Sequence, residues 1–167
     1  MKKLAFPEVK DSDFEFIKEV SEHYILHSTA TFFTEPVTVE DLKEFILTGH
    51  PKYKSYLIMA DGIPCGYCYL SQYKKRQAYD RTAEVTIYMK PGFTGLGIGT
   101  AAMQHMEQAA HQSGISVLIG IISGDNKGSI RLFEKCGYGQ CARFSQVGEK
   151  FGKILDVVAY QKMTGIS

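Results

Sequence analysis

The feature of the chain most suggestive of chemistry is a glycine-rich stretch, GFTGLGIGT, which runs from Gly92 to Thr100. Four of its nine residues are glycine, and such a density weakens helices and strands, so a loop is expected here. A strand-like segment precedes the stretch and a helical pattern follows it. Backbone N–H groups at such a loop and helix start bind phosphate, because they are donors at the positive end of the helix dipole. The stretch therefore predicts a phosphate-containing ligand.

Three kinds of phosphate-binding loop compete for this stretch. A P-loop requires GxxxxGK[ST], and no Gly-Lys pair follows these glycines. The run from Gly97 to Ala102 fits the dinucleotide form GxGxxG/A, with Asp125 as the candidate ribose-binding acid, but that motif opens a larger domain than this one. The third form, (Arg/Gln)-x-x-Gly-x-(Gly/Ala), matches from Thr94 to Gly99 and cradles the diphosphate of coenzyme A.

Two other groupings have the residue types of metal sites. Cys65 and Cys68 form a CxxC, but their surroundings are typical of a strand, in which residues three apart point to opposite faces. His23 and His27 lie one helical turn apart, and no third ligand accompanies them. We expect no metal site, and thiols that are mostly buried or partly buried.

Hydrophobic periodicity, helix-capping residues and turn residues predict the helices and strands that must position the glycine loop. Helices are expected over 11–28, 38–49, 100–114 and 126–137. Strands are expected on both sides of the Asp61-Gly62 turn within 53–71, over 82–90 and 115–123, and as a pair within 138–163. The almost wholly apolar 115–123 segment is expected to be buried on both faces. This order predicts a single α/β domain with a mixed sheet over residues 1–167.

Bulk composition restricts the class of partner. The 167 residues carry a formal net charge of +1, which gives no electrostatic reason to expect binding to nucleic acid or to an anionic membrane. No apolar run approaches the ~20 residues that span a bilayer, and the N-terminal residues do not form a signal peptide. A cytoplasmic protein is expected.

Four segments together resemble the GNAT superfamily of N-acetyltransferases, and within it the phosphinothricin and methionine sulfone–sulfoximine acetyltransferase group. They are TATFFTEPVTVED, YKKRQAYDRTAEVTIYM, NKGSIRLFEKCGY and VGEKFGKILDV, and the similarity runs from about Tyr24 to Val158. The resemblance implies a mostly antiparallel mixed sheet of about six to seven strands flanked by about four helices. It also implies an acetyl-CoA-dependent enzyme that acetylates a small amine by direct attack in a ternary complex, and a homodimer.

The resemblance further implies the roles of individual residues. Glu84 is expected to be the catalytic base. Acetyl-CoA is expected to contact Ile87, Tyr88, Met89, Thr94, Gly95, Leu96, Gly97, Ile98, Gly99, Thr100 and Asn126. The amine substrate is expected to contact Phe32, Lys74, Arg76, Tyr79, Glu84 and Thr86. Lys150 and Phe151 are expected to shape the site from the last hairpin.

Three positions depart from the family pattern, and one of them is Phe33, which stands where a polar residue is frequent. Thr94 occupies a position that is usually Arg or Gln, so one phosphate-directed side chain is lost and cofactor binding is expected to weaken. Phe133 stands where many members have the Tyr that protonates the leaving thiolate, although a thiol with a pKa of ~8.5 leaves without such help. The departures at Thr94 and Phe133 keep open the alternative of a non-catalytic acyl-CoA-binding or regulatory domain. An oxidoreductase is a more distant alternative.

Overall fold

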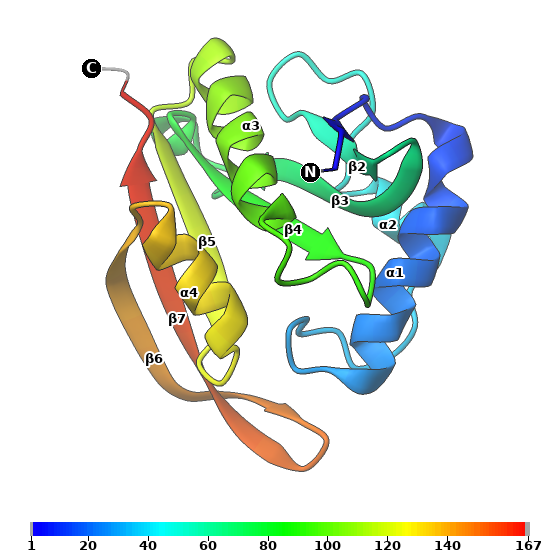
Figure 1. Ribbon diagram of the computed structural model, residues 1–167. Coiled ribbons are helices and arrows are strands. Elements are labelled where there is room, and N and C mark those ends of the chain that lie inside the picture. Colours follow the sequence, from blue (N-terminus) through cyan, green and yellow to red (C-terminus); the bar gives the residue numbers. More distant parts are fainter. Residues whose placement is uncertain (1, 166–167) are drawn as a thin grey trace.

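The computed structural model describes residues 2–165 and contains a seven-stranded sheet in the order β1-β2-β3-β4-β5-β7-β6 (Figure 1). Every neighbouring pair of strands is antiparallel except β4 and β5, which are parallel. The strands are β1 (Leu4–Ala5), β2 (Ser55–Ala60), β3 (Ile63–Gln72), β4 (Thr82–Met89), β5 (Val117–Ser123), β6 (Gly139–Lys150) and β7 (Lys153–Met163). The predicted mixed, mostly antiparallel sheet is confirmed, and the short β1 strand is an addition.

Four helices cover the two faces of this sheet: α1 (Phe14–His27), α2 (Val39–Lys43), α3 (Ile98–Gln112) and α4 (Lys127–Lys135). The apolar stripe of α3, with Met103 and Met106, packs with residues of β3 to β5 in one core cluster. Ile17 of α1 and Leu42 of α2 pack against β2 and β3 in a second cluster on the opposite face. None of the helices within residues 2–165 is long and apolar enough to cross a bilayer.

Helix α2 is shorter than the sequence indicates. The expected capping box is present, since the Thr38 hydroxyl accepts from Asp41 N (3.1 Å) and the Asp41 carboxylate accepts from Thr38 N (3.0 Å). The helix nevertheless ends at Lys43, and the chain continues as turns. In this stretch the carbonyl of Leu47 accepts from the hydroxyl of Ser55 on β2 (2.7 Å).

Strand β5 also differs from its prediction. Leu118 and Ile122 are buried on the α3 side, but Ile121 is exposed on the other face, so the expectation of burial on both faces was wrong. Helices α1 and α2 cover that second face only over β2 to β4. Apolar composition alone does not reveal which half of a sheet lacks a covering layer.

The feature of the sheet that matters most for function is a divergence between β4 and β5. The two strands pair only over Thr82–Glu84 and Val117–Ile119. Beyond these residues they separate (Figure 1). We call β1 to β4 the near arm, β5 to β7 the far arm, and the space between β4 and β5 the gap.

Candidate functional site

The edge of β4 that faces the gap carries backbone groups without a strand partner. The N–H of Lys90 donates to β3 (2.7 Å), and the C=O of Arg81 accepts from β5 (3.1 Å). Because backbone direction alternates along a strand, the N–H and C=O groups of Ile87 and Met89 face the gap. An extended ligand can therefore add to this edge as a further strand would.

The same alternation shows which of the β4 residues expected to contact the cofactor direct their backbone groups into the gap. Tyr88 pairs with Tyr67, so its backbone groups face β3 and its side chain lies on the α1 face. Of the three β4 residues expected to offer backbone groups to the cofactor, Ile87 and Met89 are therefore the two that direct them into the gap. The hydroxyl of Tyr24 on α1 already donates to the Met89 carbonyl (2.6 Å).

Glu84 lies at the point where the two strands separate. It is the last residue of β4 to pair with β5, opposite Ile119. Its neighbours Ala83 and Val85 are buried in the core cluster on the α3 side, so the Glu84 side chain lies on the α1 face, together with that of Thr86. Partial burial raises the pKa of the Glu84 carboxyl. A carboxylate in this position is suited to accept a proton near neutral pH.

The basic segment assigned to substrate binding lies in the loop between β3 and β4. The charge of Lys74, in this loop, lowers the pKa of the Glu84 carboxyl and so opposes the effect of burial. Arg76 precedes the short 3-10 helix Gln77–Tyr79, and its guanidinium has no hydrogen bond or ion pair to any residue within 2–165. The ring of Tyr79 is exposed and stands edge-on to a neighbouring tyrosine ring, with centroids 5.8 Å apart.

The glycine-rich stretch forms a loop that ends at the start of α3, as predicted. Gly92, Gly95 and Gly97 have φ angles of 94°, 76° and 77°, which other residues rarely adopt. Gly97 is the N-cap of the 15-residue α3, and no side chain caps the first turn of that helix. A Cβ atom built at Gly95 or Gly97 would meet nothing within 4 Å. Open space above uncapped N–H groups fits the diphosphate of coenzyme A.

Asn126, at the start of α4, and Phe133, within α4, each have a structural role. The Asn126 side chain accepts from Ser129 N (3.2 Å) and so caps α4, which leaves its NH₂ group available as a donor. Phe133 is 5% exposed and packs edge-on against Tyr138, with centroids 4.9 Å apart. The ring of Phe133 also fills the space in which a side chain at Gly120 would lie. Phe133 is thus a core residue.

Of the two hairpin residues expected to shape the site, Lys150 contacts the loop after α1, whereas Phe151 is exposed. Lys150, at the end of β6, is only 3% exposed, and its ammonium donates to Thr31 O (3.0 Å) and Tyr24 O (3.4 Å). Burial lowers the pKa of Lys150. A lysine in a polar hairpin gives no sign of burial in the sequence. Phe32, in the same loop as Thr31, is exposed.

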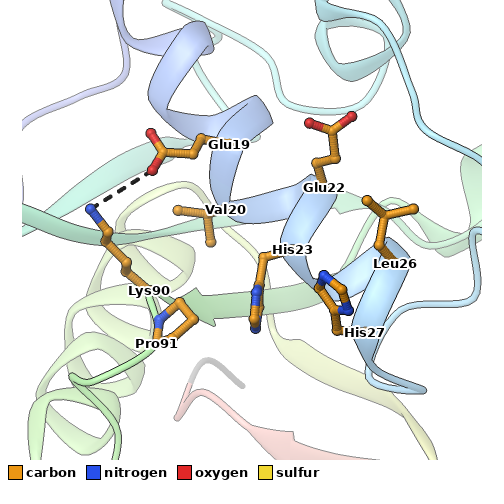
Figure 2. Close-up of a pocket in the computed structure, with 8 residues that line it drawn as sticks. All are labelled: Glu19, Val20, Glu22, His23, Leu26, His27, Lys90 and Pro91. Carbon is orange, nitrogen blue, oxygen red and sulfur yellow. Dashed lines mark ion pairs between the residues drawn. The ribbon is translucent and has the colours of Figure 1, made fainter.

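His23 and His27 line a pocket between α1 and the turn that follows β4, together with Lys90 and Pro91, as Figure 2 shows. Their ring centroids are 5.3 Å apart. Within the described part of the chain, no three His, Cys, Asp or Glu side chains are grouped so that they could hold a metal ion.

Comparisons with known proteins agree with this geometry. A model of the acetyltransferase (GNAT) family matches residues 18–138. Phosphinothricin N-acetyltransferase of Streptomyces viridochromogenes is 28% identical over 90% of this chain and 82% of its own length. L-methionine sulfoximine/L-methionine sulfone acetyltransferase of Salmonella typhimurium is 27% identical over 90% of this chain and 88% of its own length.

A solved structure shares the fold closely. The phosphinothricin acetyltransferase of Sinorhizobium meliloti, a crystal structure in complex with AcCoA, superposes with a TM-score of 0.88. The superposition covers 97% of this chain and 88% of that one, at 24% sequence identity. The divergence of β4 and β5 and the glycine loop thus occur within a known architecture.

Proposed function

The chain belongs to the acetyltransferase (GNAT) family, and on that premise we propose that it moves the acetyl group of acetyl-CoA to the amine of a small amino acid or amino-acid analogue. The family resemblance seen in the sequence is thereby confirmed. Two relatives are named for phosphinothricin and for methionine sulfoximine and sulfone, which are amino-acid analogues. Compounds of this class are our candidates for the acceptor.

The position of Glu84 is the observation that carries this proposal. Its carboxylate lies on the α1 face, at the closed end of the gap, and the free β4 edge at Ile87 begins just beyond it. An amine that enters from the α1 face can give a proton to Glu84, directly or through water. The neutral nitrogen then forms a bond to the acetyl carbon as the carbon–sulfur bond breaks, and its second proton passes to the departing thiolate, which leaves as the thiol of coenzyme A. Transfer is direct, in a ternary complex.

The residues proposed for cofactor binding divide into two groups. The N–H groups at the start of α3 and the loop from Thr94 to Thr100 would hold the diphosphate. The β4 edge and the free NH₂ of Asn126 would hold the pantetheine arm. When bound, acetyl-CoA supplies the activated acetyl thioester.

Cations would select the acceptor. The charge of Lys74 acts on the Glu84 carboxyl, and Arg76 has a guanidinium free to form a paired contact with a carboxylate or phosphinate. Thr86, Tyr79 and Phe32 would complete the acceptor side.

Arg76→Ala should raise KM for an acidic acceptor by about tenfold or more, the scale of a charged hydrogen bond, and should raise KM much less for its neutral ester. Equal increases in KM for both compounds would show that Arg76 does not bind the anionic group of the acceptor.

We also propose a homodimer that buries part of the β6–β7 hairpin. Phe144, Val147, Phe151 and Ile154 are all exposed there, which is unusual for four large apolar side chains so close in sequence. Light scattering on the purified protein should give twice the chain mass of 18.7 kDa. Val147→Asp should shift the mass toward the monomer.

A two-stage experiment tests the activity. Acetyl-CoA and CoA should raise the melting temperature, whereas NAD should not. Thiol release should then be followed with phosphinothricin, methionine sulfone, methionine sulfoximine and the common free amino acids. A shift with acetyl-CoA but no thiol release from any amine would favour a non-catalytic acyl-CoA-binding domain, and a shift with NAD alone would contradict the proposal.

A further inference from the structure

The separation of the two arms beyond Glu84 cannot be set by strand pairing. Backbone pairing between β4 and β5 stops after three residue pairs. Further along the gap, the relative position of the arms depends on side-chain contacts that cross it. Within residues 2–165, contacts from both arms converge on the end of α1 and on the 28–31 segment that follows it.

The near arm holds this segment through two tyrosines. The hydroxyl of Tyr24, in the last turns of α1, donates to the Met89 carbonyl at the end of β4 (2.6 Å). The hydroxyl of Tyr88 on β4 donates to the Ala30 carbonyl within the 28–31 segment (3.3 Å). The segment is thereby attached to the outer end of the near arm.

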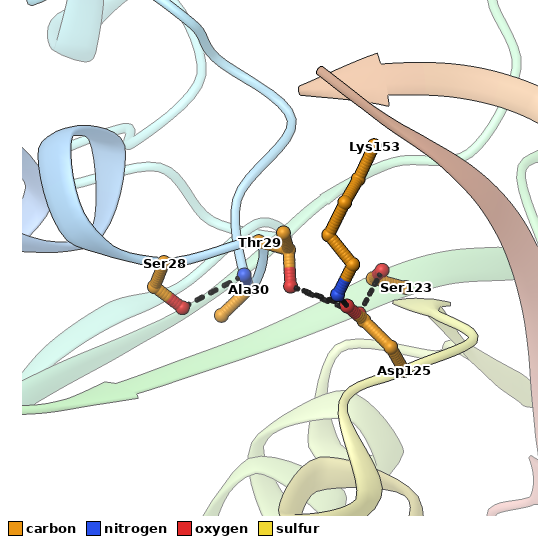
Figure 3. Close-up of polar contacts among 6 residues, drawn as sticks. All are labelled: Ser28, Thr29, Ala30, Ser123, Asp125 and Lys153. Atoms are coloured by element: carbon orange, nitrogen blue, oxygen red, sulfur yellow. Dashed lines mark hydrogen bonds and ion pairs between the residues drawn. The ribbon is translucent and has the colours of Figure 1, made fainter. Parts of the chain in front are cut away.

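The far arm holds the same segment at two points. The ammonium of Lys150, at the end of β6, donates to the carbonyls of Thr31 (3.0 Å) and Tyr24 (3.4 Å). The second point is the carboxylate of Asp125, which follows β5 (Figure 3). The hydroxyl of Thr29 donates to both carboxylate oxygens, at 2.9 and 3.1 Å. Ser123 at the end of β5 donates to the same carboxylate (2.6 Å), and the ammonium of Lys153 on β7 lies 3.1 Å from it. The bonds from Ser123 and Lys153 stay within the far arm, whereas the bond from Thr29 crosses the gap.

The 28–31 segment lies at a distance from Glu84 that suits a small acceptor. Glu84 and Tyr88 point to the same face of β4 and are four residues apart, which corresponds to ~13 Å along a strand. Thr86 lies between them on that face. Because Tyr88 contacts Ala30, the segment stands at the far end of the β4 face that begins at Glu84, and we call it the wall.

We propose that Asp125 is a positioning residue that fixes this wall by holding Thr29 across the gap. The inference rests on the proposed acetyl transfer and deepens it, because it identifies what sets the size of the acceptor space. Asp125 touches neither reactant and acts through Thr29. Loss of the bond removes one of the two attachments of the wall to the far arm, while the Lys150 contact and the attachment to the near arm remain.

Thr29→Val is the sharpest test, because it keeps the branched shape and removes only the hydroxyl. KM for L-methionine sulfone should rise by about five- to tenfold, a discounted value for a hydrogen bond to a partly exposed carboxylate. The turnover number and the calorimetric affinity for acetyl-CoA should stay within about twofold. Thr29→Ser, which retains the hydroxyl, should restore most of the wild-type KM.

The matched control is Lys153→Met. This variant removes a partner from the same carboxylate but breaks no contact across the gap, so KM should stay within about twofold of wild type. Asp125→Ala should reproduce the effect of Thr29→Val, and the double variant should be no worse than either single variant, since both remove one bond. Additive effects in this cycle would overturn the proposal, as would an unchanged KM in Thr29→Val.

Hydrogen–deuterium exchange separates this inference from the assignment of the substrate. The peptide covering residues 28–34 should exchange about tenfold faster in Thr29→Val than in wild type or in Lys153→Met, because one of its anchors is gone. This holds whether or not L-methionine sulfone is a substrate. Unchanged exchange would overturn the role of Asp125. Lack of turnover by the wild-type protein would instead count against the proposed acceptor.

Discussion

Glu84 and Lys74 illustrate how two residues acquire a joint function from their position. Burial at the closed end of the gap raises the pKa of the Glu84 carboxyl. A higher pKa makes Glu84 a stronger base near neutral pH, but it also means that a larger fraction of the carboxyl is protonated in mild acid. The charge of Lys74 opposes that second effect. The pair therefore determines over which pH range the carboxylate is ready to accept a proton.

Glu84→Gln separates an enzyme from a binding fold. Glutamine keeps the size and the hydrogen-bonding capacity of the side chain but cannot accept a proton at neutral pH. Turnover should fall by ~10²–10⁴-fold, the usual contribution of a positioned general base. Acetyl-CoA affinity, measured by calorimetry, should be nearly unchanged. The loss should shrink at high pH, where the free amine is abundant; turnover within a few-fold of wild type at pH 7 would exclude Glu84 as the base.

Lys74→Met tests the electrostatic part of the pair. Glu84 must be deprotonated to act, so turnover should rise with pH through its pKa. Removal of the Lys74 charge raises that pKa further, and the rising limb of the pH–rate profile should move to higher pH. Turnover at the acid end should drop by up to about fivefold, since exposed charge pairs contribute ~0.2–1 kcal/mol, and should match wild type above the limb. Lys74→Arg and the neighbouring Lys75→Met serve as controls; a shift in Lys75→Met of equal size would mean that only the general charge of the loop matters.

At the scale of elements, the glycine loop and α3 act as one unit. The backbone must turn sharply at Gly97 so that the first N–H groups of the helix point into open space. Residues with a side chain rarely adopt a φ of 77°, the value at Gly97. A Cβ atom at this position would clash with no neighbouring atom. The requirement for glycine here therefore comes from backbone conformation and from the ligand.

Gly97→Val should abolish measurable acetyl-CoA binding and lower the melting temperature by about 2–8 °C without unfolding the protein at room temperature. A branched residue at this φ costs at least ~1–2 kcal/mol and moves the loop to another conformation, and its side chain would also occupy the space of the diphosphate. Calorimetry and thermal unfolding measure the two effects. Gly49→Val is the matched control, since Gly49 also has a positive φ, 64°, and open surroundings. Gly49→Val should leave affinity unchanged; unaltered affinity in Gly97→Val would show that the loop does not bind the cofactor.

At the scale of the whole molecule, the two arms depend on close contact between the sheet and its helices. Gly120 on β5 lies under the ring of Phe133 on α4, and a Cβ at Gly120 would come within 2.2 Å of that ring. Phe133 in turn is buried in the main core cluster. The contact fixes α4, and with it the Asn126 end of the gap, on the far arm.

Gly120→Ala should therefore destabilise the fold by ~1–3 kcal/mol, the usual cost of overpacking a core. Urea unfolding gives the free energy. A second substitution, Phe133→Leu, should recover part of the loss in the Gly120→Ala background, because it removes the ring that is struck. Gly139→Ala is the control, since a Cβ there meets nothing within 4 Å. Equal destabilisation by the two glycine substitutions would contradict the packing argument.

The sequence by itself determined the order of elements, the glycine loop and the family. Local signals sufficed for these features: glycine density at residues 92–99, the capping box at Thr38, the alternating pattern of β4 and the Asn126 cap all act within a few residues. The prediction of Glu84 as base depended on the family motif, and its placement at the closed end of the gap makes that role geometrically reasonable.

Only the tertiary structure decided how the arms are held beyond Glu84 and which groups face the gap. Thr29 and Asp125 are 96 residues apart, and Lys150 and Thr31 are 119 apart, so no local pattern links them. The direction of the backbone groups of Ile87, Tyr88 and Met89 depends on register with β3, and the exposure of Ile121 depends on which half of the sheet lacks a helix layer. Such features arise when distant segments pack together, because a residue's partners are then set by the fold as a whole and not by its neighbours along the chain.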